Sequence, residues 1–253
     1  MMKAAVKVGL MVGVLAMGGA SAAFAENTVC LTQALSFADK PVTGCLTAQQ
    51  AADLMDRPIL LGGEEKKGKG LELTHPTDIR EKKSVKTCRD YQAATGEDWF
   101  AMTTYDMTIE GHFQKHCGLL ALIAKATPSK TDHLPKTPVT QVDPGGISVA
   151  VLALFDPEGT ENLDRAATQG RTLKDYADRG ALEVTEQTPT RLDIDFRSMS
   201  GSIQELARGD FSGDGVKDAL VTCGVRAQGG SYRVTDLMVV TKRSANGLLE
   251  VVD

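Results

Sequence analysis

The sequence predicts an α+β fold, with a helical, disulfide-linked first part followed by a mostly antiparallel β-sheet part. Apolar residues recur at helical spacing in the first half of the chain, and they alternate or form short runs in the second half. A segment rich in proline and glycine separates the two patterns. We therefore predict four parts: a signal peptide at 1–25, a helical cysteine-containing region at 26–128, a linker at 129–146 and a β-rich region at 147–253.

The first 25 residues have the pattern of a signal peptide. Two lysines and no acidic residue precede an apolar stretch, and Ala23-Phe24-Ala25 has the small-x-small form of a signal peptidase site. The apolar stretch is shorter than the ~20 residues that a membrane-spanning helix needs. We expect cleavage near Ala25, a periplasmic or extracellular location, and no membrane span in the mature chain.

Five cysteines follow this leader, and an oxidising compartment allows them to form disulfides. Nearest-neighbour pairing joins Cys30 to Cys45 and Cys88 to Cys117, although four cysteines allow three connectivities. Cys223 is the odd cysteine and lies in an apolar run, so we expect a buried, unreactive thiol there.

The helical elements have recognisable boundaries. Residues 47–50, Thr-Ala-Gln-Gln, form a capping box before an apolar segment that ends at Pro58. The composition of 62–70 predicts a mobile surface loop. From residue 98 to about residue 126, apolar residues at helical spacing predict a long amphipathic helix.

The second half contains several predicted strands around one helical segment. A continuous apolar run at 147–155 and an alternating segment at 192–197 are strand candidates, and 160–179 has helical character and ends at Gly180. Further strands are expected at 219–225, at 236–241 and, after an Asn-Gly turn, at 248–252.

One loop carries a chemical motif, Asp210-Phe211-Ser212-Gly213-Asp214-Gly215-Val216-Lys217-Asp218. Side-chain oxygens stand at alternate positions around a glycine turn, which is how a short loop surrounds a hard cation with oxygen ligands. The predicted ligands of a Ca²⁺ ion are the side chains of Asp210, Ser212, Asp214 and Asp218 and the carbonyl oxygen of Val216. The alternative is a strand-connecting turn in which these residues serve only the turn geometry.

The loop resembles the D-x-D-x-D-G-x-x-D calcium loop of the FG-GAP/VCBS type, which occurs in integrin-like propellers and in many exported bacterial proteins. The resemblance covers these nine residues and the strand after them. It departs from the pattern at Ser212, where Asp or Asn is usual. The resemblance implies a calcium-binding loop and implies nothing about a ligand or substrate.

The acidic composition, with a net charge of -5, argues against a general nucleic-acid binder. We predict an exported, calcium-stabilised binding or structural module of unknown ligand, with a possible protein or envelope partner. One alternative is a periplasmic hydrolase whose acid/base site forms only in the fold around His112 and His116, with Asp106 and Glu110 on the same helix. Another is an inhibitor or protective protein that acts against an exported enzyme.

Overall fold

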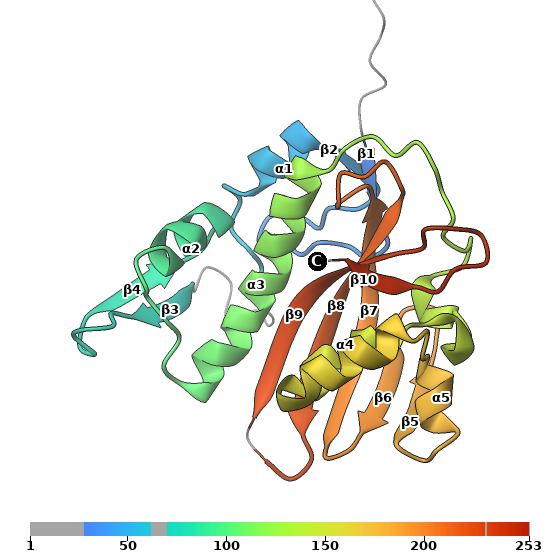
Figure 1. Cartoon of the computed structure of the whole chain (residues 1–253). Coiled ribbons are helices and arrows are strands. Elements are labelled where there is room, and N and C mark those ends of the chain that lie inside the picture. The colour runs from blue at the N-terminus through green and yellow to red at the C-terminus, as the bar shows by residue number, and fades with distance from the viewer. Residues whose placement is uncertain (1–27, 62–69, 231, 253) are drawn as a thin grey trace, which may run out of the picture.

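The structure of the protein is a computed structural model that describes residues 28–61, 70–230 and 232–252 (Figure 1). The predicted signal peptide and nearly all of the predicted loop at 62–70 lie outside these residues. Across the described ranges, no helix is both long enough and apolar enough to cross a membrane.

The main sheet is antiparallel, which confirms the predicted α+β class. Its strands follow the order β10-β9-β8-β7-β1-β2, and β6 pairs with β7 and with β5. The strands of this sheet are β1 (Thr28–Leu31), β2 (Cys45–Thr47), β5 (Leu182–Gln187), β6 (Leu192–Phe196), β7 (Met199–Gly209), β8 (Asp218–Ala227), β9 (Arg233–Thr241) and β10 (Glu250–Val252).

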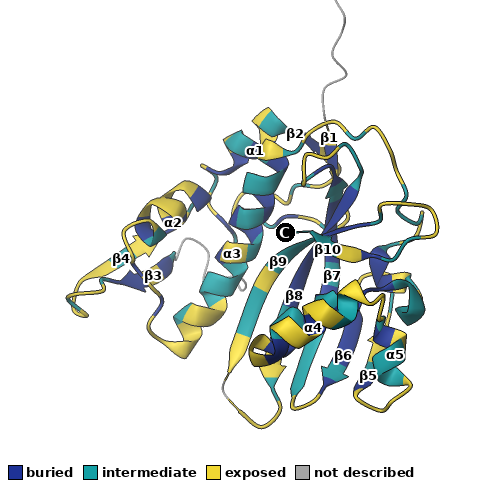
Figure 2. Cartoon of the chain, in the orientation of Figure 1, coloured by how far each residue is buried: buried dark blue, intermediate teal, exposed yellow. Residues whose placement is uncertain are grey.

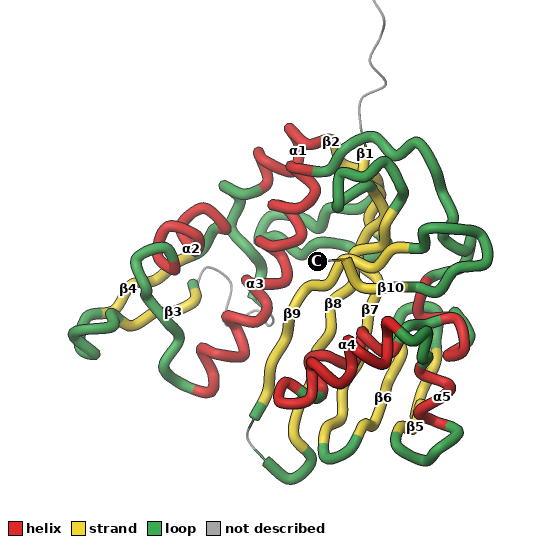
Figure 3. Tube along the Cα trace, in the orientation of Figure 1, coloured by secondary structure: helices red, strands yellow, loops and turns green. Residues whose placement is uncertain are grey.

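The described chain also contains a separate two-stranded ribbon, five α-helices and several short 3-10 helices. Figure 3 shows the ribbon beside α2 and apart from the main sheet. The ribbon strands are β3 (Leu71–Thr74) and β4 (Lys82–Val85), and the α-helices are α1 (Ala48–Leu54), α2 (Cys88–Thr95), α3 (Thr104–Lys125), α4 (Thr160–Thr168) and α5 (Leu173–Ala177).

Strand β7 holds the two halves of the chain together. One of its edges pairs with β8 along its whole length. Its other edge is shared, because β6 pairs with the beginning of β7 and β1 pairs with Ala207 and Arg208 near its end. The first part of the chain therefore contributes strands to the main sheet as well as helices.

Each face of the sheet packs on a different hydrophobic cluster (Figure 2). The 3-10 helix η4 (Val149–Phe155) packs on one face, in the cluster that contains Ile194 and Val221, and helix α4 packs against η4. Helix α3 packs on the other face, where Leu206 and Leu220 join its cluster. Because α3 lies beside only part of the second face, the remainder is open.

The predictions of α1 and α3 and the nearest-neighbour disulfide pairing are confirmed, whereas the helical segment predicted at 160–179 forms two helices, α4 and α5, with a break at 169–172. Thr47 and Gln50 form the capping box of α1, and the long helix is α3, whose N-cap Thr103 accepts a hydrogen bond from the backbone N–H of Asp106. The disulfides are Cys30–Cys45, between β1 and β2, and Cys88–Cys117, between α2 and α3. Cys223 is a buried free thiol, and burial raises its pKa to about 12.

The strand predicted at 147–155 is wrong, because most of this run forms η4. The Ser148 side chain accepts a hydrogen bond from the N–H of Ala150 and begins the helix. Val149, Val151, Leu152 and Phe155 are all buried. A short apolar run surrounded by core has no alternation with which to distinguish a strand from a helix.

The segment 129–146, where a linker was predicted, packs against the end of β7 and the loop that leads into β8. The backbone of Thr131 bridges Val216, and two short 3-10 helices follow, η2 (Val139–Gln141) and η3 (Pro144–Gly146). The backbone N–H of Val139 donates to the buried Glu205 carboxylate at 2.6 Å. These contacts fix the segment as a packed crossing between the two halves.

Candidate functional site

The predicted metal loop, which we call the acidic loop (Asp210–Asp218), joins β7 to β8. Gly213 and Gly215 adopt positive φ angles of 79° and 86°, which glycine tolerates best. Asp210 is only 1% exposed. Its carboxylate accepts hydrogen bonds from the N–H groups of Gly213 and Gly215, at 2.7 and 2.9 Å, and from the Thr127 hydroxyl at 2.6 Å.

Asp218 closes the acidic loop from the start of β8. Its Oδ2 accepts hydrogen bonds from the N–H groups of Phe211 and Ser212, both at 3.0 Å. Its Oδ1 is buried and has no hydrogen-bond partner. A buried carboxylate oxygen without a partner is costly, and a cation is one group that would satisfy it.

The other predicted ligands do not all converge on this point. The Ser212 hydroxyl lies 3.5 Å from Asp210 Oδ1. Asp214 turns away, because its carboxylate accepts the N–H of Val216 and faces the Arg243 guanidinium at 3.4 Å. In the described part of the chain, no three His, Cys, Asp or Glu side chains are gathered closely enough to hold a metal. The structure therefore places Asp210, Ser212 and Asp218 together at the base of the loop, whereas Asp214 is directed toward Arg243.

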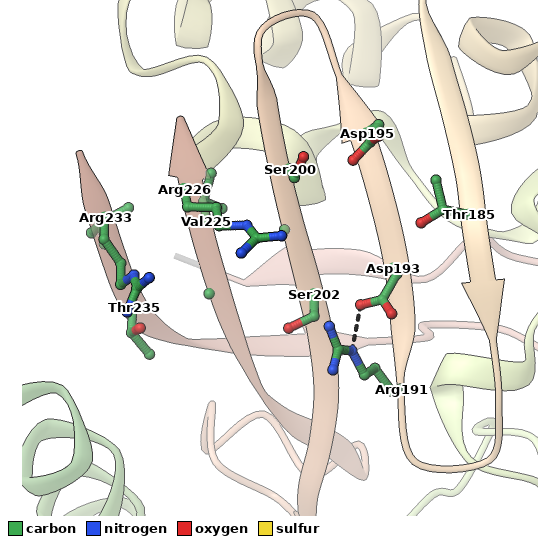
Figure 4. Close-up of a pocket in the computed structure, with 13 residues that line it drawn as sticks. Thr185, Arg191, Asp193, Asp195, Ser200, Ser202, Val225, Arg226, Arg233 and Thr235 are labelled. Carbon is green, nitrogen blue, oxygen red and sulfur yellow. Dashed lines mark hydrogen bonds and ion pairs between the residues drawn. The ribbon is translucent and has the colours of Figure 1, made fainter. Parts of the chain in front are cut away.

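A second candidate site was not predicted from the sequence. It is a shallow depression of about 520 Å³ on the open part of the sheet (Figure 4). We call it the polar face and define it by the polar side chains that Figure 4 labels: Thr185, Arg191, Asp193, Asp195, Ser200, Ser202, Arg226, Arg233 and Thr235.

Strand register arranges the polar face in rows. Asp195 pairs with Ser200, Ser200 with Arg226, and Arg226 with Arg233, so these four residues form one row across β6, β7, β8 and β9. The neighbouring row is Asp193, Ser202, Gly224 and Thr235. Acidic groups therefore lie on the β6 side of the face and basic groups on the β8 and β9 side.

Arg226 and Arg233, the two arginines of the first row, differ from the other arginines of the described chain in their contacts. Arg191, at the acidic end of the polar face, forms an ion pair with Asp193 at 2.5 Å. Arg226 and Arg233 have neither an ion pair nor a ring contact among the described residues, and both are exposed. The remaining arginines either pair with a carboxylate or, at Arg179, lie over the Tyr176 ring.

A deeper groove of about 1430 Å³ continues from the polar face between α3 and the β8–β9 hairpin. We call it the α3 groove. Lys115 lines it, and burial lowers the pKa of this lysine. Burial also raises the pKa of Glu110, whose carboxylate accepts a hydrogen bond from the Tyr91 hydroxyl at 3.3 Å. The exposed Met107 and Tyr232 side chains border the groove.

The residues of the predicted hydrolase site do not form one cluster. His116 is buried, its Nδ1–H donates to the His112 carbonyl oxygen, and its Nε2 accepts the N–H of Ser36. Burial lowers the pKa of His116 to about 3. Glu110 and His112 line the α3 groove, whereas Asp106 caps the exposed start of α3. With both ring nitrogens occupied by backbone groups, His116 serves packing.

The sequence contained a partial signal for the polar face. The alternation of Asp193 and Asp195 with apolar residues predicts a strand with one solvated face. The strand is confirmed as β6, but Asp193 is only 9% exposed and pairs with Arg191. The single sequence could not pair Asp195 with Ser200 and Arg226, because register between distant strands depends on the whole sheet. Comparison with family models, with curated proteins and with solved structures found no match, so the two sites stand on their geometry.

Proposed function

We propose that the protein is an exported binding module that holds a polar ligand on its polar face and is stabilised by Ca²⁺ at the acidic loop. The observation that carries the proposal is the open, polar part of an otherwise covered sheet. Elsewhere the faces of the sheet pack on hydrophobic clusters. On the polar face, hydroxyl, carboxylate and guanidinium groups instead line a depression of about 520 Å³. In ligand sites, a few polar groups placed in a concavity fix the orientation of the ligand, and this depression supplies such groups.

Export is supported by the two disulfides, which persist in oxidising compartments and are rare in the cytosol. The signal-like leader agrees with that compartment. The role of Ca²⁺ in this proposal is stability, because the acidic loop and the polar face occupy opposite ends of the β7–β8 hairpin. At ~3.3 Å per residue, the two rows of the polar face, which cross β8 at Gly224 and Arg226, lie roughly 20 to 26 Å from Asp218.

The binding function can be tested without knowing the ligand. The purified protein is dialysed to equilibrium against a small-molecule extract, and retained compounds are identified by mass spectrometry. A Ser202→Trp variant fills the centre of the polar face, and an Asp214→Asn variant changes only the acidic loop. We expect a compound that the wild type and the loop variant retain and the Ser202→Trp variant loses. Retention of no compound, or equal retention by all three proteins, would contradict the proposal.

The calcium site can be tested by thermal unfolding in calcium and in chelator. For a dissociation constant of ~10⁻⁴ to 10⁻³ M, as in extracellular modules, about 10 mM Ca²⁺ would stabilise the native state by about 1.4 to 2.7 kcal/mol. Asp214→Asn should weaken this effect. Arg243→Gln should strengthen it, because it removes the cation that faces Asp214. Identical midpoints with and without Ca²⁺ in both the wild type and Arg243→Gln would overturn the calcium proposal.

A further inference from the structure

Among the described residues, Arg226 and Arg233 of the polar face have no ion-pair partner, and this indicates the chemistry of the ligand. We infer that Arg226 and Arg233 bind an anionic group, a carboxylate, phosphate or sulfate, of a ligand whose other end carries hydroxyl or ammonium groups that donate to Asp195. This inference rests on the proposed binding function and names the class of ligand.

The first step of the argument is the cross-strand register. Arg226 and Arg233 are direct partners on β8 and β9, so their Cβ atoms are ~4.5 to 5.5 Å apart. Like charges directly opposite each other destabilise a sheet. No carboxylate in the described residues neutralises either guanidinium, although the protein is acidic overall. An anion bound at either guanidinium would offset this repulsion.

The second step is the fit of the donors. A guanidinium presents a planar set of N–H groups that matches the oxygens of a carboxylate or phosphate. Figure 4 shows the Arg226 side chain extending over β7 toward Ser200 and Ser202, and the Arg233 side chain extending along β9 toward Thr235. Hydroxyl groups therefore stand beside both guanidinium groups and can donate to the same anion or accept from a ligand hydroxyl.

The third step is the opposite end of the row. Asp195 lies on β6, two strands from Arg226, which corresponds to about 10 Å at the usual strand spacing. Its carboxylate has no ion-pair partner among the described residues, unlike Asp193, which is held by Arg191. Because ionised carboxylates only accept hydrogen bonds, Asp195 selects a ligand with a donor group at that distance.

Calorimetric titration with defined probes tests the inference. The probes are inorganic phosphate, sulfate, glucuronate and glucose 6-phosphate, and glucose is the neutral control. We expect at least one of the two sugar anions to bind at least tenfold more tightly than glucose, with affinity falling as salt rises. Arg226→Gln and Arg233→Gln should each weaken that binding at least tenfold, and Asp195→Asn should weaken the sugar anions more than phosphate. Arg179→Gln, an arginine outside the polar face, should leave it unchanged.

A measurement on the free protein keeps the test independent of the probes chosen. At low salt, Arg226→Gln and Arg233→Gln should each raise the midpoint of thermal unfolding, and the gain should shrink at high salt as the repulsion is screened. Lower midpoints at low salt would contradict the inference, as would anion affinities equal to that of glucose. If extract compounds are retained on the polar face independently of both arginines, the binding function stands and this inference fails.

Discussion

The imidazole of His116 has a structural role, although its position on α3 made it a candidate acid/base group. Its two nitrogens are bound to backbone groups of His112 and Ser36, which leaves no free lone pair or proton for a substrate. The i, i+4 spacing of the two histidines was readable from the sequence. The backbone of Ser36, 80 positions earlier, was not, because that contact depends on the tertiary fold.

His116 should make the stability of the protein depend on pH. Its pKa is about 3 in the folded state and near 6.5 when unfolded, so the unfolded chain binds more protons between these values. The free energy of unfolding should therefore fall with pH below 6.5, by about 2 kcal/mol between pH 7 and pH 5 from this residue. Urea denaturation should show a smaller pH dependence in His116→Gln, and an equal dependence in the two proteins would contradict this account.

The acidic loop likewise contains a tertiary contact that the sequence did not predict. Residue types and spacing indicated Asp210, Ser212, Asp214, Val216 and Asp218 as ligands. The sequence could not indicate that Arg243 faces Asp214, because this arginine follows β9 and is brought to the loop by the β8–β9 pairing. Such an exposed pair contributes ~1 kcal/mol or less, so a bound cation can displace it.

At the scale of elements, local signals predicted most helices and strands. The exception is the run at 147–155, which was predicted as a strand and forms η4. Alternation identified β6, and capping residues identified the start of α1. The run at 147–155 has no alternation, and it forms η4, in which Val149, Val151, Leu152 and Phe155 are buried. The edge partners of β7 were likewise beyond prediction, since they join segments from both ends of the chain.

Alanine substitutions at Gly111 and Gly201 test how closely α3 and β7 are packed. A Cβ atom at Gly111 of α3 would lie 3.9 Å from its nearest neighbour, the Thr235 hydroxyl oxygen, which is ordinary contact. Gly111→Ala should therefore stabilise the protein by about 1 kcal/mol through helix propensity. A Cβ atom at Gly201 of β7 would lie 2.6 Å from the Phe155 ring and 2.7 Å from the Gly224 carbonyl oxygen.

Gly201→Ala should accordingly destabilise the protein by about 1 to 3 kcal/mol, the usual effect of overpacking. Chemical denaturation of both variants and the wild type measures the two effects in one experiment. Equal shifts in the same direction would contradict the packing described for α3 and β7.

At the scale of the whole molecule, the two compositional halves of the sequence share one sheet. The first half supplies β1, β2 and the helices that cover Leu206 and Leu220, and the second half supplies the remaining strands of the main sheet. Hydrophobic pattern distinguished the halves but carried no information on how they join. That joining is what leaves the polar face open beside α3.

This shared sheet predicts that the second half does not fold alone. A fragment of residues 129–253 lacks β1 and α3, so Leu206 and Leu220 would be exposed, at about 1.5 to 3 kcal/mol each. That loss is large against the ~5 to 15 kcal/mol stability of a typical domain. We expect the fragment to melt without a cooperative transition in circular dichroism, whereas the chain from residue 26 onward melts sharply. A sharp transition in the fragment would refute the prediction.

The pairing of β1 with β7 also has a consequence for the rate of folding. The Thr32 hydroxyl, just after β1, donates to the carbonyl oxygen of Glu205, 173 positions later. Contacts that close such long loops are formed late and slowly, because the loop entropy is lost before the contact stabilises anything. Strand β1 therefore pairs with β7 late in folding, and until then the edges of both strands remain open to wrong partners.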